Sequence, residues 1–133
     1  MKKTKIVMVL TGRIKPYVRM TQKGKYVDPQ AAEYLASKQA LQLQMKTSMN
    51  ADNYERFANG IPLLAYLSFH VPSSQGHRAD LDNLIKAVLD AGNDILYEDD
   101  RWIDNIRAHR NIIDNSFKEP GVYITIEPLE KED

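Results

Sequence analysis

Hydrophobic and polar positions along the chain follow two different periods, and together they predict both strands and helices. Residues 4–10, 62–71, 102–113 and 121–127 are rich in β-branched and apolar side chains, so each segment is predicted to be a strand. A short hairpin is also predicted over residues 18–27, with its turn at residues 23–24. These segments indicate a sheet that contains most of the apolar residues.

Two segments between the predicted strands favour helices. Asp28 and Pro29 are typical of an N-cap and a first helical position, and no glycine or proline follows until after Met49. In residues 80–92 the apolar side chains recur at helical spacing, and Gly92 is a suitable end. The order of elements predicts an α+β fold, with two main helices packed on a mixed or antiparallel sheet. No repeat or linker divides the chain, so a single domain over residues 1–133 is expected.

Composition excludes several classes of protein. The chain has 133 residues and no cysteine, which excludes a disulfide scaffold, a thiol nucleophile and a cysteine-bound metal site. No apolar run approaches the roughly 18 residues of a membrane span. The apolar stretch near the N-terminus is too short for a signal peptide, so a cytoplasmic protein is expected.

Charge is distributed unevenly although the net charge is zero. Residues 1–27 contain eight basic and no acidic side chains, whereas residues 80–133 contain six basic and fourteen acidic ones. This gradient is consistent with a polyanion contact on one element and a cation site on another. The simpler interpretation is that the two ends neutralise each other across the fold.

Carboxylates gather around the second predicted helix. Asp80 and Asp82 are two positions apart, so in an extended chain they point the same way, about 6.6 Å apart. Hard oxygen ligands favour Mg²⁺ or Mn²⁺ over Zn²⁺. Lys86 follows Asp82 by one helical turn and is suited to contact a phosphate oxygen. The acidic run at residues 98–100 is a candidate source of a third carboxylate.

Two simpler interpretations of these residues remain open at this stage. Asp82 and Lys86 have the spacing of an ordinary helical ion pair, which stabilises a helix by about 0.3–0.5 kcal/mol. The acidic run at residues 98–100 is also typical of a solvated loop.

The combined pattern resembles the RusA family of Holliday junction resolvases, which are small phage-type endodeoxyribonucleases. The central match is Asp80-Leu81-Asp82-Asn83-Leu84, then Lys86, Asp90 and Asp99-Asp100. The N-terminal part is similar as well, with Gly12, Pro16, Arg19, Gly24-Lys25-Tyr26 and a helix that opens at Pro29. One departure is Ala79, because relatives often carry a basic residue directly before the first aspartate and the arginine here is Arg78.

The resemblance implies a RusA-like fold and assigns roles to residues. Asp80, Asp82 and Asp100 would be the catalytic carboxylates that bind Mg²⁺, with Mn²⁺ as an alternative, and Asp99 would only position its neighbour. Lys86 would be the catalytic lysine. The implied reaction is paired phosphodiester cleavage of four-way DNA junctions in recombination and repair, carried out by a homodimer. The basic side chains expected to contact the DNA backbone are Arg13, Lys15, Arg19, Lys23 and Lys25.

Two other functions stay open from the sequence. The first is a non-catalytic protein that binds junctions and keeps the acidic residues for folding or metal binding. The second is a metal-dependent phosphoesterase or nuclease that acts on other branched DNA or on a small nucleotide. Assays on junction, flap and duplex DNA distinguish these three functions.

Overall fold

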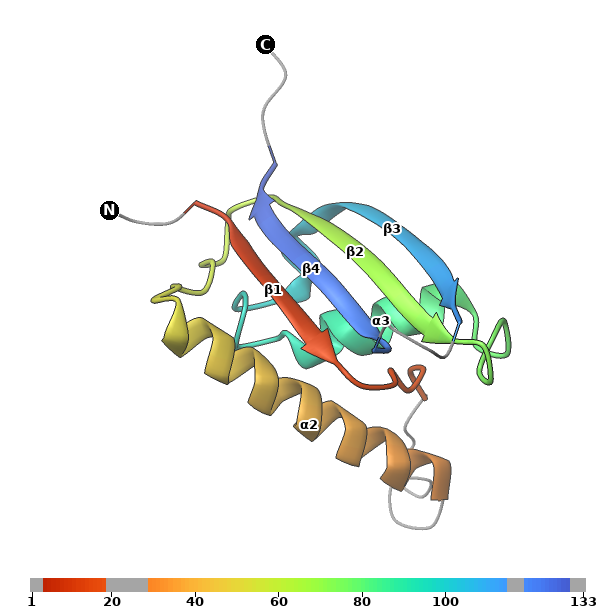
Figure 1. Cartoon of the computed structure of the whole chain (residues 1–133). Coiled ribbons are helices and arrows are strands. Elements are labelled where there is room, and N and C mark those ends of the chain that lie inside the picture. Colours follow the sequence, from red (N-terminus) through yellow and green to blue (C-terminus); the bar gives the residue numbers. More distant parts are fainter. Residues whose placement is uncertain (1–3, 19–28, 115–118, 130–133) are drawn as a thin grey trace.

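Four strands form one mixed sheet in the computed structural model, which describes residues 4–18, 29–114 and 119–129. The sheet order is β1-β4-β2-β3, where β4 is antiparallel to both of its neighbours and β2 is parallel to β3 (Figure 1). The predicted mixed sheet is therefore confirmed, and the predicted hairpin at 18–27 falls mainly outside the described residues. The strands are β1 Ile6–Thr11, β2 Leu63–Pro72, β3 Ile103–Ile113 and β4 Gly121–Pro128.

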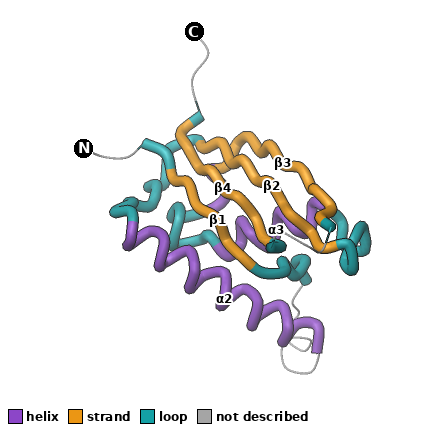
Figure 2. Tube along the Cα trace, viewed as in Figure 1, coloured by secondary structure: helices purple, strands orange, loops and turns teal. Residues whose placement is uncertain are grey.

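Two helices pack with this sheet. The long helix α2 (Pro29–Ala51) lies beside β1, and the shorter α3 (Leu81–Ala91) lies behind the central strands in the view of Figure 2. A single 3₁₀ turn, η1 (Asp100–Trp102), leads into β3. Both predicted helices are confirmed. Among the described residues, no helix combines the length and the apolar character that crossing a membrane requires.

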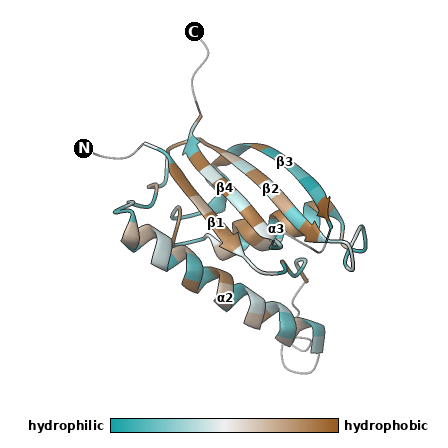
Figure 3. Ribbon diagram, viewed as in Figure 1, coloured by the Kyte–Doolittle hydropathy of each residue, from teal (hydrophilic) through white to brown (hydrophobic). Residues whose placement is uncertain are grey.

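The core follows from the alternation of side chains along the strands. Figure 3 shows it on β2 and β4 as bands of different hydropathy. Every second residue of β1 is buried, and its partners on β4 are buried too. Leu84 and Val88 of α3 are fully buried within the same core. Burying one such side chain contributes about 1.5–3 kcal/mol, so these contacts fix α3 against the sheet.

The register of the parallel strands places the two ends of α3. Pro72 at the end of β2 pairs with Ile113, and Leu63 at its start pairs with Ile103. The chain enters α3 after the end of β2 and then returns to the start of β3. Helix α3 therefore runs from one end of this strand pair back to the other. Its 11 residues span about 16 Å.

Candidate active site

The start of α3 presents two exposed carboxylates. Asp80 is the N-cap residue, with an extended backbone (φ −69°, ψ 142°), and its side chain makes no capping hydrogen bond. Asp82 is exposed in the first turn of the helix. Neither carboxylate has a hydrogen bond or ion pair with another described residue. The partial positive charge of the helix N-terminus lowers the cost of holding two negative charges there.

The loop after β1 is fastened to this end of α3. The Tyr17 backbone N–H donates to the Asn83 carbonyl at 3.0 Å. The buried side chain of Gln75 accepts from Arg13 Nε at 3.0 Å and donates to the Ile14 carbonyl at 3.2 Å. Because Gln75 belongs to the turn between β2 and α3, these bonds bring Arg13 to the segment that leads into Asp80.

Lys86 is exposed on the same side of α3, one turn after Asp82. Its ammonium lies 6.0 Å from the centre of the Tyr17 ring, within range of a weak cation–π contact. The ion pairs of the described residues do not include one between Asp82 and Lys86, so the simple helical pair is not formed. The lysine charge therefore remains available to an anion.

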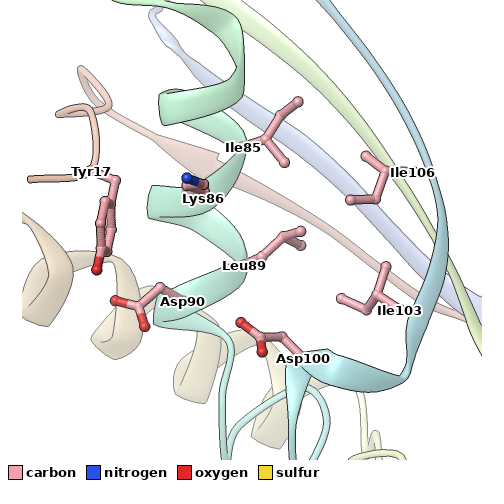
Figure 4. Close-up of a pocket in the computed structure, with 8 residues that line it drawn as sticks. All are labelled: Tyr17, Ile85, Lys86, Leu89, Asp90, Asp100, Ile103 and Ile106. Carbon is pink, nitrogen blue, oxygen red and sulfur yellow. The ribbon is translucent and has the colours of Figure 1, made fainter. Parts of the chain in front are cut away.

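Lys86 also lines an open cavity of about 360 Å³ next to α3. Figure 4 shows the Asp90 and Asp100 carboxylates at the far end of this cavity, toward the end of the helix. The opposite wall is apolar, so the cavity has one charged and one hydrophobic side. Its lining residues are Tyr17, Ile85, Lys86, Leu89, Asp90, Asp100, Ile103 and Ile106.

Asp90 is tied to α2 by two side chains. Its Oδ2 accepts a hydrogen bond from the Tyr34 hydroxyl at 2.9 Å and lies 3.0 Å from the Lys38 ammonium. Burial and the adjacent Asp90 raise the pKa of Tyr34, so its hydroxyl stays protonated and can donate. Asp90 thus joins the end of α3 to the long helix.

Asp100 is also held by its neighbours. Its backbone N–H donates to Asn93 Oδ1 at 2.7 Å, and Asn93 Nδ2 donates to its Oδ2 at 3.2 Å. Burial raises the pKa of Asp100 above its usual value, Asn93 opposes this shift, and the charges of Asp99 and Asp90 add to it. Asp99 itself accepts from the Arg101 backbone N–H and caps η1.

The three predicted metal ligands are not gathered within one chain. Asp80 and Asp82 lie at the start of α3, whereas Asp100 lies beyond its end, where its charged neighbours are Asp99 and Asp90. In the part of the chain that the structure describes, no three His, Asp or Glu side chains are close enough to hold a metal ion. The ligand set therefore stays a prediction, and one chain alone does not assemble it.

Only part of the predicted DNA-contacting set is described. Arg13 is exposed, and Lys15 is half-exposed with its ammonium 3.8 Å from Glu33. Arg19, Lys23 and Lys25 lie outside the described residues.

Arg110 is a residue near the proposed site that the sequence did not predict. Arg110 of β3 donates a hydrogen bond from Nη1 to the carbonyl of Ala79, directly before Asp80. No local signal indicated this contact, because it depends on the parallel pairing of β3 with β2. The arginine nearest to Asp80 in the sequence is Arg78, which is exposed.

The comparison with protein families agrees with the fold and with the arrangement of residues around α3. The sequence pattern of the family described as "Endodeoxyribonuclease RusA" matches residues 9–127, which is nearly the whole chain and includes all of α3 and η1. No individual curated protein matches the chain. The match and the mixed four-stranded sheet with two helices lead to the same conclusion. The chain belongs to the RusA family, the Holliday junction resolvases, and is an endodeoxyribonuclease.

Proposed function

We propose that the protein cleaves four-way DNA junctions in a reaction that depends on Mg²⁺, or on Mn²⁺ in its place. Asp80 and Asp82 are proposed to begin the metal site, with Asp100 as the third carboxylate. The observation that carries the proposal is the pair of exposed carboxylates at the start of α3, which have no partner in the described part of the chain and lie beside an anchored arginine. Two such charges, close together, are best stabilised by a cation.

The donor chemistry suits the proposed metal. Asp80 and Asp82 offer hard oxygen ligands, and the chain has no cysteine that would favour a softer ion. A divalent ion bound there would activate a water molecule and stabilise negative charge on the phosphate. The helix N-terminus adds its own partial positive charge for the same phosphate.

The cationic side chains have separate proposed roles. Lys86 is proposed to contact a non-bridging oxygen of the scissile phosphate, since its ammonium is exposed and pairs with no carboxylate among the described residues. Arg13 and Lys15 are proposed to contact the DNA backbone, because the loop that carries them crosses the start of α3. Arg19, Lys23 and Lys25 are proposed for the same role from the sequence alone.

A homodimer is proposed for two reasons. A junction has two symmetric strands to cut, and a two-fold pair of chains presents one site to each. In addition, the length of α3, about 16 Å, separates Asp100 from Asp80 and Asp82 within one chain. A second copy that supplies its Asp100 would complete the ligand set. Dimer formation would then be needed to form each metal site, and it would also provide two sites for the two strands.

The direct experiment is cleavage of a four-way junction with and without Mg²⁺, with EDTA as a further control. We expect cuts with Mg²⁺ only, and we expect Asp82→Asn and Lys86→Ala to abolish them. Asp104→Asn is the matched control, because Asp104 is an exposed aspartate at the start of β3, outside the proposed site. Cleavage at the wild-type rate by Asp82→Asn would remove the basis of the assignment.

Parallel assays separate the other candidates. A non-catalytic junction-binding protein would bind the junction and never nick it, whatever the metal. A nuclease for other branched DNA would cut flaps as fast as or faster than junctions.

A further inference from the structure

Arg110 connects β3 to the segment that carries the proposed catalytic aspartates. It pairs in register with Phe69 of β2, whose side chain is fully buried, so Arg110 projects toward the helix side of the sheet. There its Nη1 donates to the carbonyl of Ala79, a buried residue. The guanidinium is thereby held beside the backbone that leads directly into Asp80.

The charge of Arg110 is anchored but not neutralised. Its hydrogen-bond partner is an uncharged carbonyl, and among the described residues it forms no ion pair with a carboxylate. A guanidinium has five N–H donors in a fixed fork, and the bond to Ala79 uses one nitrogen. Arg110 is only half-buried, so the rest of the fork is accessible.

Arg13 shows the same arrangement on the other side of this segment. Its Nε is bonded to the neutral side chain of Gln75, in the turn before α3, and it too forms no ion pair with a described residue. By contrast, Lys38 is neutralised by Asp90 at the other end of the helix. Anchored arginines without carboxylate partners are typical of phosphate-binding positions.

We propose that Arg110 binds a DNA backbone phosphate at the start of α3 and positions the Asp80 segment against it. One nitrogen of the fork holds the Ala79 carbonyl, and the remaining donors contact the phosphate oxygens. This inference rests on the proposed function, because it assumes that DNA reaches Asp80 and Asp82.

The test compares Arg110→Gln with Arg107→Gln in binding a four-way junction in Ca²⁺ over a range of salt concentrations. The glutamine amide can still donate to Ala79 but carries no charge. Arg107 is the matched control, because it is an exposed arginine on the same strand and projects from the opposite face. We expect Arg110→Gln to weaken binding about tenfold and to reduce the salt slope by about 0.9, the value for one lost phosphate contact.

Each outcome supports or overturns the inference. A lower melting temperature with an unchanged salt slope in Arg110→Gln would show a purely structural role and overturn it, as would an equal loss in Arg107→Gln. If Arg110→Gln does not fold, Arg110→Lys decides. We expect Arg110→Lys to keep the salt slope of the wild type but to bind the junction about threefold more weakly, because one ammonium cannot contact both the Ala79 carbonyl and the phosphate as the guanidinium does. Wild-type affinity in Arg110→Lys would overturn the inference.

The failure of the proposed function is distinguishable from these results. Wild-type protein that binds junctions with a steep salt dependence but never cuts them with Mg²⁺ overturns the proposed function and leaves the Arg110 inference intact. Wild-type protein that does not bind branched DNA at all overturns both.

Discussion

The two ends of α3 hold their charged side chains in different ways. At its start, Asp80 and Asp82 have no partners among the described residues, and the nearby Arg13 and Arg110 are bonded only to neutral groups. At its end, Asp90 is bonded to Tyr34 and Lys38 of α2, and Asp100 is bonded to Asn93.

This difference shows that one helix serves two purposes. Charges that compensate each other within the chain stabilise the fold and offer little to a ligand. Charges that are positioned but uncompensated gain their partners from a substrate or a cation. The start of α3 therefore suits the proposed reaction site, whereas the end of α3 fastens this helix to α2. Asp100 lies at that end and is also a proposed metal ligand.

The largest expected effect comes from the start of the helix. Asp80→Asn should reduce junction cleavage about 10²–10³-fold, the usual cost of losing one electrostatic stabiliser of a transition state. The lost stabiliser would be the divalent ion, because the substitution removes a ligand charge proposed to hold it. Junction binding in Ca²⁺ should persist, since the cationic side chains are unchanged. Single-turnover cleavage and a gel-shift titration measure the two quantities. Loss of both junction binding and folding in Asp80→Asn would instead show that Asp80 has a structural role.

At the end of the helix, Gly92→Ala should destabilise the fold. A Cβ at position 92 would lie 2.6 Å from the Tyr97 hydroxyl oxygen, and that hydroxyl is fixed by its hydrogen bond to the Leu89 carbonyl. Such overpacking costs about 1–3 kcal/mol, measurable by denaturant unfolding. Adding Tyr97→Phe removes the clashing oxygen and should restore part of the loss; no difference between the single and double variants would contradict this explanation.

A smaller effect is expected for the bond between α2 and α3. Lys38→Met should lower the free energy of unfolding by about 1 kcal/mol, because the Lys38–Asp90 pair is partly shielded from water. A double-mutant cycle with Asp90→Asn isolates the coupling between the two side chains. Strictly additive losses would show that the pair does not join the helices.

The smallest expected effect concerns Asp100 and pH. Burial raises its folded-state pKa, so above that pKa the ionised carboxylate makes the fold less stable. Asp100→Asn should therefore be slightly more stable than wild type at pH 7. This advantage should shrink as pH falls through the raised pKa and vanish below about 3.9, the ordinary pKa of an aspartate. Thermal unfolding of both proteins across this pH range tests the prediction. A stability difference between Asp100→Asn and wild type that does not change with pH would contradict it.

The sequence predicted the fold because its signals are local. The helical spacing of apolar residues such as Leu84 and Val88 indicated α3, and the β-branched and apolar residues at 4–10 indicated the strand β1. The site was harder for a geometric reason. Helical spacing correctly placed Lys86 one turn after Asp82 on an exposed side of α3. It could not show that the 11 residues of α3, about 16 Å long, separate Asp100 from Asp80 and Asp82.

Long-range contacts could not be predicted at all. The bonds of Asp90 to Tyr34 and of Arg110 to Ala79 join residues that are 56 and 31 positions apart. They depend on how α2 lies against α3 and on the register of β2 with β3, and neither is encoded in a local pattern.

The most direct test of the account mixes two inactive variants. Asp80→Asn and Asp100→Asn should each be inactive alone. In a mixed dimer, one site would combine both substitutions, whereas the other would have neither. Half of the dimers in an equal mixture should be mixed, so nicking of the junction should return to about a quarter of the wild-type rate. A mixture that contains verified mixed dimers and still does not nick would contradict the claim that the second copy supplies Asp100.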